Sequence, residues 1–482
     1  MIWTLVGLAF LAAHVAAISV LIVVERRQPA ATLAWLMTLV FLPVVGLMAY
    51  FVFGAPRIAR TRRRMAIAAR RIEQVRERWQ VQRKLKANEG PLPEARTEQL
   101  LRLGAALSST PPSPGNRAQL LDNAAATYRA MSKAIDVATD HVHVEFYIIQ
   151  PDETGRLLRD RLLQAARRGV QVRVLFDAVG SSRLPGDFFA ELTASGGKVA
   201  AFRPVLRALI RLRRRDRVDF RNHRKIVVVD GRIAFTGGIN IGREYLGLDP
   251  AIREWRDAHM ELEGPSALSL QTAFAEDWYT ATGETLDEER YFPEPPFLTD
   301  GAIVQVVDSG PDRDWASIET MYSFSIAASQ RRVWITNPYF VPSPAIENAL
   351  VAAALRGVDV RILVPQRSDS AIVQLAARSY FPTLLEAGAR IYRYARGFVH
   401  AKTMVVDEWV ATVGSANMDM RSFRLNFELN PFVLDREFVH TLARSFLDDL
   451  RHATPYTSDD VARAHLLARF LTGVARLMSP LL

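Results

Sequence analysis

The stretch RNHRKIVVVDG at residues 221–231 decides the fold class, because it joins a buried strand to chemically reactive side chains. Ile226 to Val229 are four β-branched residues in a row, which predicts a strand buried on both faces. His223 and Lys225 lie before this run, and Asp230 follows it directly. Period two along the chain puts His223 and Lys225 on one face, where both can point at one ligand.

The stretch FVHAKTMVVDE at residues 398–408 repeats this pattern. Counted from each histidine, a lysine follows at +2, an aspartate at +7, a glycine at +14 and an asparagine at +17. The two sets are His223, Lys225, Asp230, Gly237 and Asn240, and His400, Lys402, Asp407, Gly414 and Asn417. The chain has six lysines against 55 arginines, so two lysines at matched positions indicate a need for a compact ammonium group. Capping of strand ends would explain one copy, but two extended copies indicate a site.

The surrounding sequence is duplicated as well. Three stretches of the first copy have counterparts in the second, in the same order. They are HVHVEFYII with RVWITNPYF, RLLRDRLLQAARRG with PAIENALVAAALRG, and VQVRVLFDA with VDVRILVPQ. Strand, helix and strand in this order predict βαβ units with parallel strands. We expect a domain at residues 118–300 and its duplicate at 301–482, related by a pseudo-twofold axis.

The residue types indicate phosphodiester chemistry at one site shared by the two copies. Histidine suits both nucleophilic attack and proton transfer near neutral pH. Lysine and the asparagine amide can hold phosphate oxygens as charge develops, without a metal or other cofactor. One imidazole would form a phosphohistidine while the other moves protons on the alcohols. We expect Asp230 and Asp407 to orient these imidazoles.

The beginning of the chain indicates a membrane anchor. Residues 1–24 and 28–56 carry no formal charge and are long enough to cross a bilayer, so they predict a transmembrane helical hairpin at 1–54. A cleaved signal peptide is the alternative for the first span. Residues 55–117 form a basic arm and linker, in which 57–86 contain twelve basic and two acidic residues. The two spans predict a multi-pass protein, and the basic excess that follows them predicts that the catalytic domains lie on the cytoplasmic side.

The net charge of +10 equals that of residues 57–86 alone, so the rest of the chain is nearly neutral. The excess therefore indicates attraction to anionic phospholipids rather than to nucleic acid. A second basic run at 207–224 leads into the first motif and is a candidate contact for an anionic substrate. The absence of cysteine excludes disulfides and thiol catalysis.

The duplicated motifs resemble the paired HKD motifs of the phospholipase D superfamily. Within it, the chain resembles the membrane-anchored cardiolipin synthase family of bacteria. The resemblance is carried by ERRQPAATLAW, LPVVGLMAYFVFG, FRNHRKIVVVDG, GGINIGREY, GSANMDMRSFRLNFELN and SPLL, and so covers nearly all of the chain.

This resemblance implies two α/β sandwich domains with mixed sheets and an active site at their interface, in an enzyme of the bacterial inner membrane. It implies transfer of a phosphatidyl group from one phosphatidylglycerol to another, giving cardiolipin and glycerol. By analogy His223 is the nucleophile and His400 the acid and base, although the pattern itself is symmetric. Asp257 and Glu428 match acidic family positions, where they either orient the opposing histidines or pair with nearby arginines.

Other interpretations stay open at this stage. The same intermediate intercepted by water would make the chain a phospholipase D that releases phosphatidic acid. A nuclease of the superfamily and a catalytically silent scaffold fit the membrane segment and the complete motifs less well. We expect His141 and His143 to be core or strand-end histidines rather than metal ligands. The amphipathic tail at 462–482 either lies on the membrane surface or packs on the second domain.

Overall fold

The computed structural model describes residues 2–24, 29–50, 95–108, 110–203, 219–248 and 254–481. The chain forms two compact units, one containing residues 1–60 and 206–219 and the other 61–205 and 220–482. The basic segment 57–86 and residues 207–218 of the second basic run lie outside the described residues.

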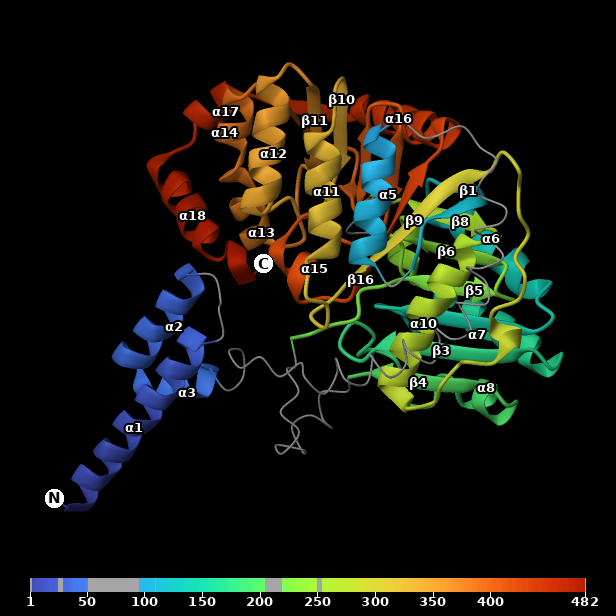
Figure 1. The fold of residues 1–482 in the computed structure, drawn as a ribbon, viewed down its shortest axis with the longest axis horizontal. Helices are drawn as coiled ribbons and strands as arrows, with labels where there is room; N and C mark the ends of the chain where they lie inside the picture. The colour runs from blue at the N-terminus through green and yellow to red at the C-terminus, as the bar shows by residue number, and fades with distance from the viewer. Residues whose placement is uncertain are drawn as a thin grey trace. The chain divides into compact units, whose positions relative to one another are not determined.

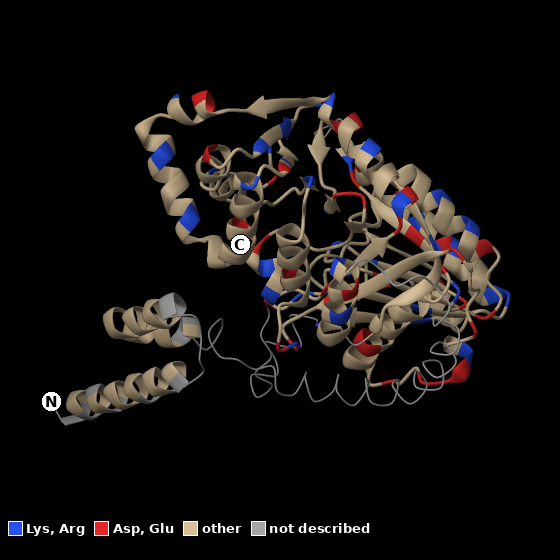
Figure 2. Ribbon diagram, turned by 45° about the horizontal axis from the view of Figure 1, so that its top comes forward, with Lys and Arg blue, Asp and Glu red and all other residues tan. Residues whose placement is uncertain are grey.

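The small unit contains the N-terminal helices α1 (Ile2–Val24), α2 (Pro29–Phe41) and α3 (Pro43–Ala49). Pro43 separates α2 from α3, because proline is accepted in the first turn of a helix but not in its interior. Ile18, Ile22 and Leu39 pack with Tyr50 in a small apolar core. The described residues of these helices carry no Lys, Arg, Asp or Glu and are tan in Figure 2. Within the described part of the chain, no helix combines the length and the apolarity needed to span a bilayer.

The large unit is built on one continuous sheet, in which the described residues form fifteen strands (Figure 1). Their order is β17 (Ala453–Tyr456), β12 (Arg390–Tyr394), β11 (Asp359–Pro365), β10 (Arg332–Thr336), β14 (Thr403–Val406), β15 (Val410–Val413), β16 (Glu428–Leu434), β9 (Ala302–Ser309), β1 (Ser113–Leu121), β8 (His259–Glu263), β6 (Ile233–Gly237), β5 (Ile226–Val229), β2 (His141–Phe146), β3 (Gln171–Asp177) and β4 (Lys198–Phe202).

The order shows the duplication directly. Read outward from the central antiparallel pair β1 and β9, one half runs β1, β8, β6, β5, β2, β3, β4 and the other β9, β16, β15, β14, β10, β11, β12. In each half the outer three of these strands are parallel and the others antiparallel, so both halves of the sheet are mixed. The prediction of two duplicated α/β domains is confirmed.

Helices cover both faces of this sheet. The first half carries α6 (Ala124–Asp136), α7 (Glu153–Arg167), α8 (Ala190–Ala194) and α10 (Ser266–Thr282). The second carries α11 (Ser317–Ala327), α12 (Pro344–Leu355), α13 (Ala371–Arg378), α14 (Phe381–Glu386), α15 (Met420–Arg424), α16 (Arg436–Leu450), α17 (Ser458–Ala462) and α18 (Leu466–Leu477). Because both faces are covered, the motif strands β5 and β14 are buried along their whole length.

The equivalent helices α7 and α12 begin and end alike. Side-chain oxygens of Asp152 and Ser343 accept the first free backbone N–H groups, which caps the helices. Both helices end in the predicted Arg-Gly pair, with Gly169 at φ 89° and Gly357 at φ 85°, the left-handed conformation that favours glycine after a helix.

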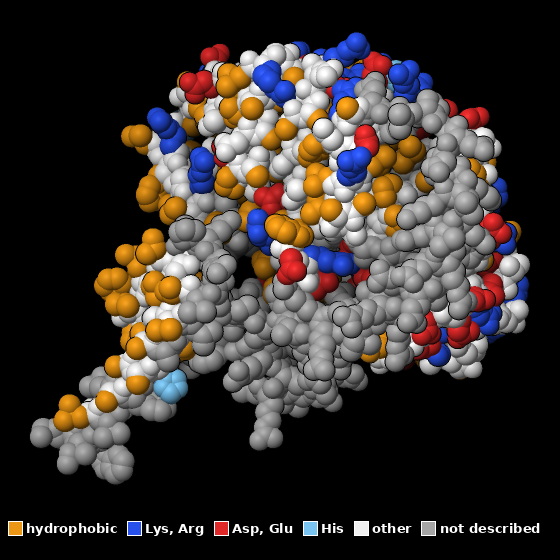
Figure 3. All heavy atoms as spheres, in the orientation of Figure 1, with side chains coloured by type: hydrophobic (Ala, Val, Ile, Leu, Met, Phe, Trp, Pro, Cys, Tyr) orange, Lys and Arg blue, Asp and Glu red, His pale blue; other side chains and the backbone are white. Residues whose placement is uncertain are grey.

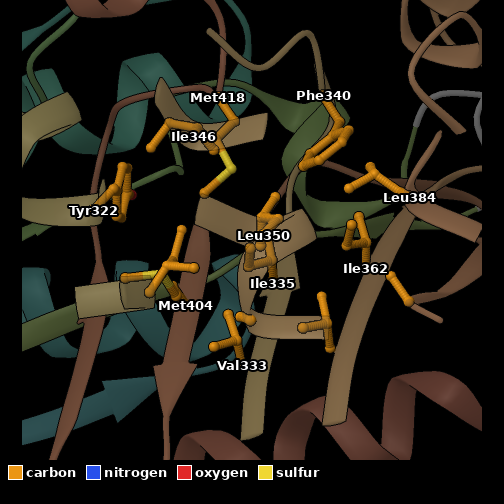
Figure 4. Packing of buried hydrophobic residues seen from close by; sticks show 14 of the residues in the cluster. Tyr322, Val333, Ile335, Phe340, Ile346, Leu350, Ile362, Leu384, Met404 and Met418 are labelled. Carbon is orange, nitrogen blue, oxygen red and sulfur yellow. The ribbon is translucent and has the colours of Figure 1, made fainter. Parts of the chain in front are cut away.

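The second half has an extensive hydrophobic core between its sheet and α11, α12 and α13 (Figure 4). Ile335, Met404 and Leu350 are buried there. Helix α5 (Ala95–Leu107) also joins this core through Leu100, beside α11 (Figure 1). Residues 95–107 therefore pack as part of the second half, although the sequence places them in a linker.

Candidate active site

The two motif histidines lie where the halves meet, each one just before its buried strand. His223 donates its backbone N–H to the carbonyl of Phe427 at 2.9 Å, and His400 donates its N–H to the carbonyl of Arg256 at 2.7 Å. A short parallel pair, β7 (Trp255–Arg256) with β13 (Phe398–Val399), makes the second of these contacts, and a bridge between Asn222 and Phe427 makes the first. Each histidine is therefore held by the backbone of the opposite half.

Each histidine also receives a carboxylate from the opposite half. Nδ1 of His223 lies 2.9 Å from Glu428, and Nδ1 of His400 lies 2.7 Å from Asp257. These acidic residues open or precede the equivalent strands β16 and β8, which explains why both reach across the joint. The sequence left open whether they would pair with arginines instead. With Nδ1–H donated to a carboxylate, Nε2 of each neutral ring keeps its lone pair for chemistry.

Charge and burial set the protonation of these pairs. Burial alone would raise the pKa of Asp257 and of Glu428, but the facing histidines and lysines hold both below their ordinary values. Burial, together with Lys402, lowers the pKa of His400 to about 4. Burial also lowers the pKa of His223, and Glu428 opposes that shift. Both imidazoles are therefore neutral near pH 7.

Lys225 and Lys402 are fully buried beside the histidines. Nζ of Lys225 donates to the carbonyl of His223 at 2.6 Å, and Nζ of Lys402 lies 2.9 Å from both ring nitrogens of His400. Burial lowers the pKa of Lys225 to about 7 and that of Lys402 to about 8. Dehydrated ammonium groups of this kind bind an incoming anion strongly, since no water shell must be removed first.

The motif aspartates lie elsewhere, and the expectation that they orient the imidazoles is wrong. Asp230 accepts the backbone N–H groups of Thr139, Asp140 and His141 at the far end of strand β5. Asp407 accepts those of residues 330–332 in the same way. Both aspartates are left-handed, with φ 52° and 50°, so they turn the chain after the strand. A strand of four residues separates each carboxylate from its own histidine.

The asparagines expected at the phosphate are buried near the histidines. Asn240 donates from Nδ2 to the Tyr245 hydroxyl at 2.7 Å, and its Oδ1 accepts the N–H of Ile148 at 3.2 Å. Asn417 is 6% exposed, and its backbone N–H donates to the Ser422 hydroxyl at 3.2 Å.

A difference between the two motifs, GGIN against GSAN, has a role that the sequence analysis missed. Ser415 donates its hydroxyl to Glu428, the carboxylate that holds His223. Its counterpart is Gly238, where a Cβ atom would lie 2.1 Å from Oδ1 of Asp257. The first half needs a glycine here because Asp257 occupies the space of the serine side chain. The two stretches differ at Gly238 against Ser415 and at Ile239 against Ala416, and the change from glycine to a polar residue was the available signal.

Aromatic rings and a buried ion-pair network surround the site. Tyr147 contacts His223 edge-on at 5.0 Å between ring centroids, and Trp255 contacts His400 at 5.2 Å. Arg224, next to His223, pairs with Asp277 at 2.8 Å in the first half and Asp308 at 3.2 Å in the second. The described end of the basic run 207–224 thus stabilises the joint rather than facing solvent.

His141 and His143 have structural positions, as predicted. His143 is fully buried and stacks on Phe274. Its Nδ1 lies 2.9 Å from Oε1 of Gln271. His141 is also buried, with Nδ1 2.8 Å from Asp140. Among the described residues, no group of three histidine or acidic side chains is arranged to hold a metal ion.

Comparisons with known proteins agree with this geometry. A family model described as cardiolipin synthase, phospholipase D-like domain, matches residues 131–278 and 324–450. A second, described as phospholipase D-nuclease N-terminal, matches residues 11–54. A cardiolipin synthase of Geobacillus sp. (strain WCH70) is 41% identical over 466 residues, covering 96% of this chain and 91% of that protein. A cardiolipin synthase of Halalkalibacterium halodurans is 39% identical over 467 residues, covering 96% and 92%.

A solved structure shares the fold. The phosphatidylserine synthase of Haemophilus influenzae superposes with a TM-score of 0.57 at 15% identity, covering 80% of this chain and all of that one.

Proposed function

The chain belongs to the cardiolipin synthase family with duplicated phospholipase D-like domains, and on this premise we propose that it joins two phosphatidylglycerol molecules into cardiolipin and releases glycerol. It is a phosphatidyltransferase that acts on phospholipids. The observation that supports the proposal most is the paired site itself, with two neutral imidazoles whose Nδ1 atoms are fixed by carboxylates of the opposite half.

The first step uses Nε2 of His223 as the nucleophile. It attacks phosphorus of one phosphatidylglycerol, a P–N bond forms, and the P–O bond to the headgroup glycerol breaks. The glycerol oxygen leaves with a proton from Nε2 of His400. His400 takes up this proton at Nε2 from solvent when substrate binds.

The proton on His400 is explained by the substrate. Burial, Lys402 and Lys225 all lower the pKa of His400. A phosphodiester anion between the lysines neutralises their charge, so the pKa of His400 rises when substrate binds. Lys225 and Lys402, with the amides of Asn240 and Asn417, hold the phosphate oxygens during the transfer.

The second step reverses the proton movement. A hydroxyl of a second phosphatidylglycerol gives its proton to Nε2 of His400 and attacks phosphorus. The P–N bond to His223 breaks, cardiolipin forms, and both imidazoles return to their starting state. No step requires a cofactor.

We extend the proposal to the domain boundaries and to the membrane. Residues 118–300 and 301–482 form the two duplicated domains, and residues 1–54 form a hairpin that anchors the enzyme in the bacterial inner membrane. The large apolar side chains exposed on α1 and α2, such as Leu5, Val20 and Met37, support the anchor. The basic excess at 57–86 then orients the domains toward the cytoplasm and its anionic phospholipids.

Product analysis tests the reaction. Purified full-length protein is added to vesicles of pure phosphatidylglycerol with a chelator present, and lipids and glycerol are followed by mass spectrometry. We expect cardiolipin and glycerol in equal amounts. Phosphatidic acid in place of cardiolipin would show that water is the acceptor and would refute the transferase.

Single substitutions test the roles of the histidines. His223→Ala and His400→Ala are each expected to abolish turnover. Only His400→Ala should still accumulate a phosphatidyl-enzyme from acyl-labelled donor, because its nucleophile is intact. Trapping in His223→Ala instead would reverse the assignment.

A further inference from the structure

Helix α18 presents its apolar side to the outside, opposite to the usual arrangement in a folded domain. Leu466, Phe470 and Leu477 are 83%, 66% and 79% exposed. At about 100° per residue, these side chains and Leu467, Leu471 and Val474 fall within an arc of about 140°. A helix on a soluble domain normally turns such an arc toward the core.

The opposite side of α18 fixes it to the second half. Ala475 is buried against the core that contains α13. Just beyond the helix, Ser479 shares a hydrogen bond with the Tyr380 hydroxyl at 3.1 Å. Arg476 packs over the ring of Tyr380 and donates to the carbonyl of Ser379 at 3.4 Å. Small and polar residues therefore make the protein contact, and the large apolar residues are directed outward by that contact.

Charge identifies the kind of partner. Residues 461–482 contain Arg463, Arg469 and Arg476 and no acidic residue. On the helix, Arg469 and Arg476 lie in an arc between the docked side and the apolar side. An apolar arc with the exposed Arg469 at its edge fits the boundary between anionic headgroups and acyl chains of a bilayer, where this guanidinium stays at headgroup level, whereas Arg476 is held by Tyr380, Ser379 and Glu347. Figure 3 shows hydrophobic side chains in orange and basic side chains in blue at the position that α18 occupies in Figure 1.

The helix is also connected to the active site. The turn η5 (Ser479–Leu481), which follows α18, packs against α15. Helix α15 begins three residues after Asn417 of the second motif. A surface that holds α18 therefore lies close to the motif that receives the lipid phosphate.

We propose that the exposed arc of α18 inserts into the surface of an anionic phospholipid bilayer, as a membrane contact of the catalytic unit separate from the N-terminal hairpin. The choice of a lipid partner rests on the proposed function, since a phosphatidyltransferase must reach headgroups that stay in the bilayer. Sequence alone left membrane contact and packing on the second domain as alternatives. The packing is observed on one side of the helix, and the proposal concerns the other side.

Fluorescence quenching by lipid tests the proposal without using activity. The chain has no cysteine, so Phe470→Cys gives one labelling site for an environment-sensitive dye. Leu355→Cys is the matched control, because Leu355 is a 70% exposed apolar residue at the end of α12. Both full-length proteins are reconstituted into phosphatidylglycerol vesicles that contain lipid with a quencher in its acyl chain.

We expect a blue shift and strong quenching at position 470 and neither at 355. Equal quenching at the two positions would overturn the proposal. A blue shift at 470 without lipid quenching would also overturn it, because a protein surface, either the hairpin or a second copy, would then cover the arc.

Activity gives a second measurement. Leu467→Glu with Phe470→Glu changes two exposed side chains, so the fold is expected to stay intact, which circular dichroism checks. Turnover on phosphatidylglycerol vesicles should fall several-fold, with no loss on phosphatidylglycerol dispersed in detergent micelles. Equal loss on both substrates would contradict a bilayer-specific role. If wild-type protein made no cardiolipin at all, the proposed function would fail while the quenching result would still decide the docking of α18.

Discussion

Replacing Lys225 by methionine should make the protein more stable while it abolishes turnover. The side chain is completely buried, and burial lowers its pKa from 10.5 to about 7. The unfolded chain keeps the ordinary value, so it binds a proton that the folded state disfavours. At pH 7 this difference disfavours folding by about 4 kcal/mol. Methionine removes that term but also the hydrogen bond to the His223 carbonyl, worth about 1 kcal/mol, so Lys225→Met should gain about 3 kcal/mol.

The pH dependence of this gain has a definite sign. Because the folded pKa of Lys225 lies below the unfolded one, the destabilisation is absent above pH 10.5 and grows as the pH falls toward 7. The advantage of Lys225→Met should therefore fall from about 3 kcal/mol at pH 7 to nearly zero at pH 10.

Equilibrium denaturation of the purified full chain in detergent, followed by tryptophan fluorescence at both pH values, measures the effect. Lys198→Met is the matched control, since Lys198 is 55% exposed and the change should stay within about 0.5 kcal/mol. A Lys225→Met protein no more stable than wild type at pH 7, or an advantage that persists at pH 10, would refute the reasoning.

Three further predictions concern the site and its support. Asp230→Ala removes an acceptor of three backbone N–H groups and should lower the free energy of unfolding by about 2–4 kcal/mol, measured by denaturation. The folded fraction should keep its specific activity. A selective loss of kcat would show that the aspartate takes part in the chemistry. Gly238→Ala should push Asp257 away from His400 and lower kcat by about 10²-fold. Gly186→Ala is the control and should leave kcat unchanged, because the space around its Cβ position is open. Equal kinetics of the two variants would contradict the steric argument. In the pH profile, kcat/KM should fall as the pH rises through about 7–8, where the free enzyme loses the charges of Lys225 and Lys402. The fall in kcat should lie at higher pH, because bound phosphate raises the pKa values of both lysines. If kcat and kcat/KM fell at the same pH, this would argue against lysines at the phosphate.

The duplication and the two motifs could be predicted from sequence because each depends on residues close together in the chain. The β-branched runs before Asp230 and Asp407 predict the buried strands, and equal offsets from His223 and His400 predict equivalent positions. The family resemblance added Asp257 and Glu428. Their partners stayed open, because His223 and Glu428 are 205 residues apart and no local pattern states which elements meet.

The error over the motif aspartates has a local cause. Asp230 is followed by Gly231, and both are left-handed, which is the usual sign of a tight turn between antiparallel strands. The Asp-Gly pair between β5 and β6 was therefore a turn signal, while the assignment to the imidazole followed from chemical analogy. The direction of α18 could not be read either, because an amphipathic pattern gives the width of an apolar arc and not the side on which the helix docks.

The crossing of His223 with Glu428 also bears on how the enzyme becomes active during synthesis. The first histidine leaves the ribosome long before its carboxylate, which follows 205 residues later, and the backbone carbonyl of Phe427 that holds its N–H is equally late. A partly made chain can thus fold its first domain, since domains fold largely as units, yet its His223 lacks both of these partners. Under the proposed mechanism, a chain whose translation stops before Phe427 and Glu428 therefore has no oriented nucleophile and transfers no lipid.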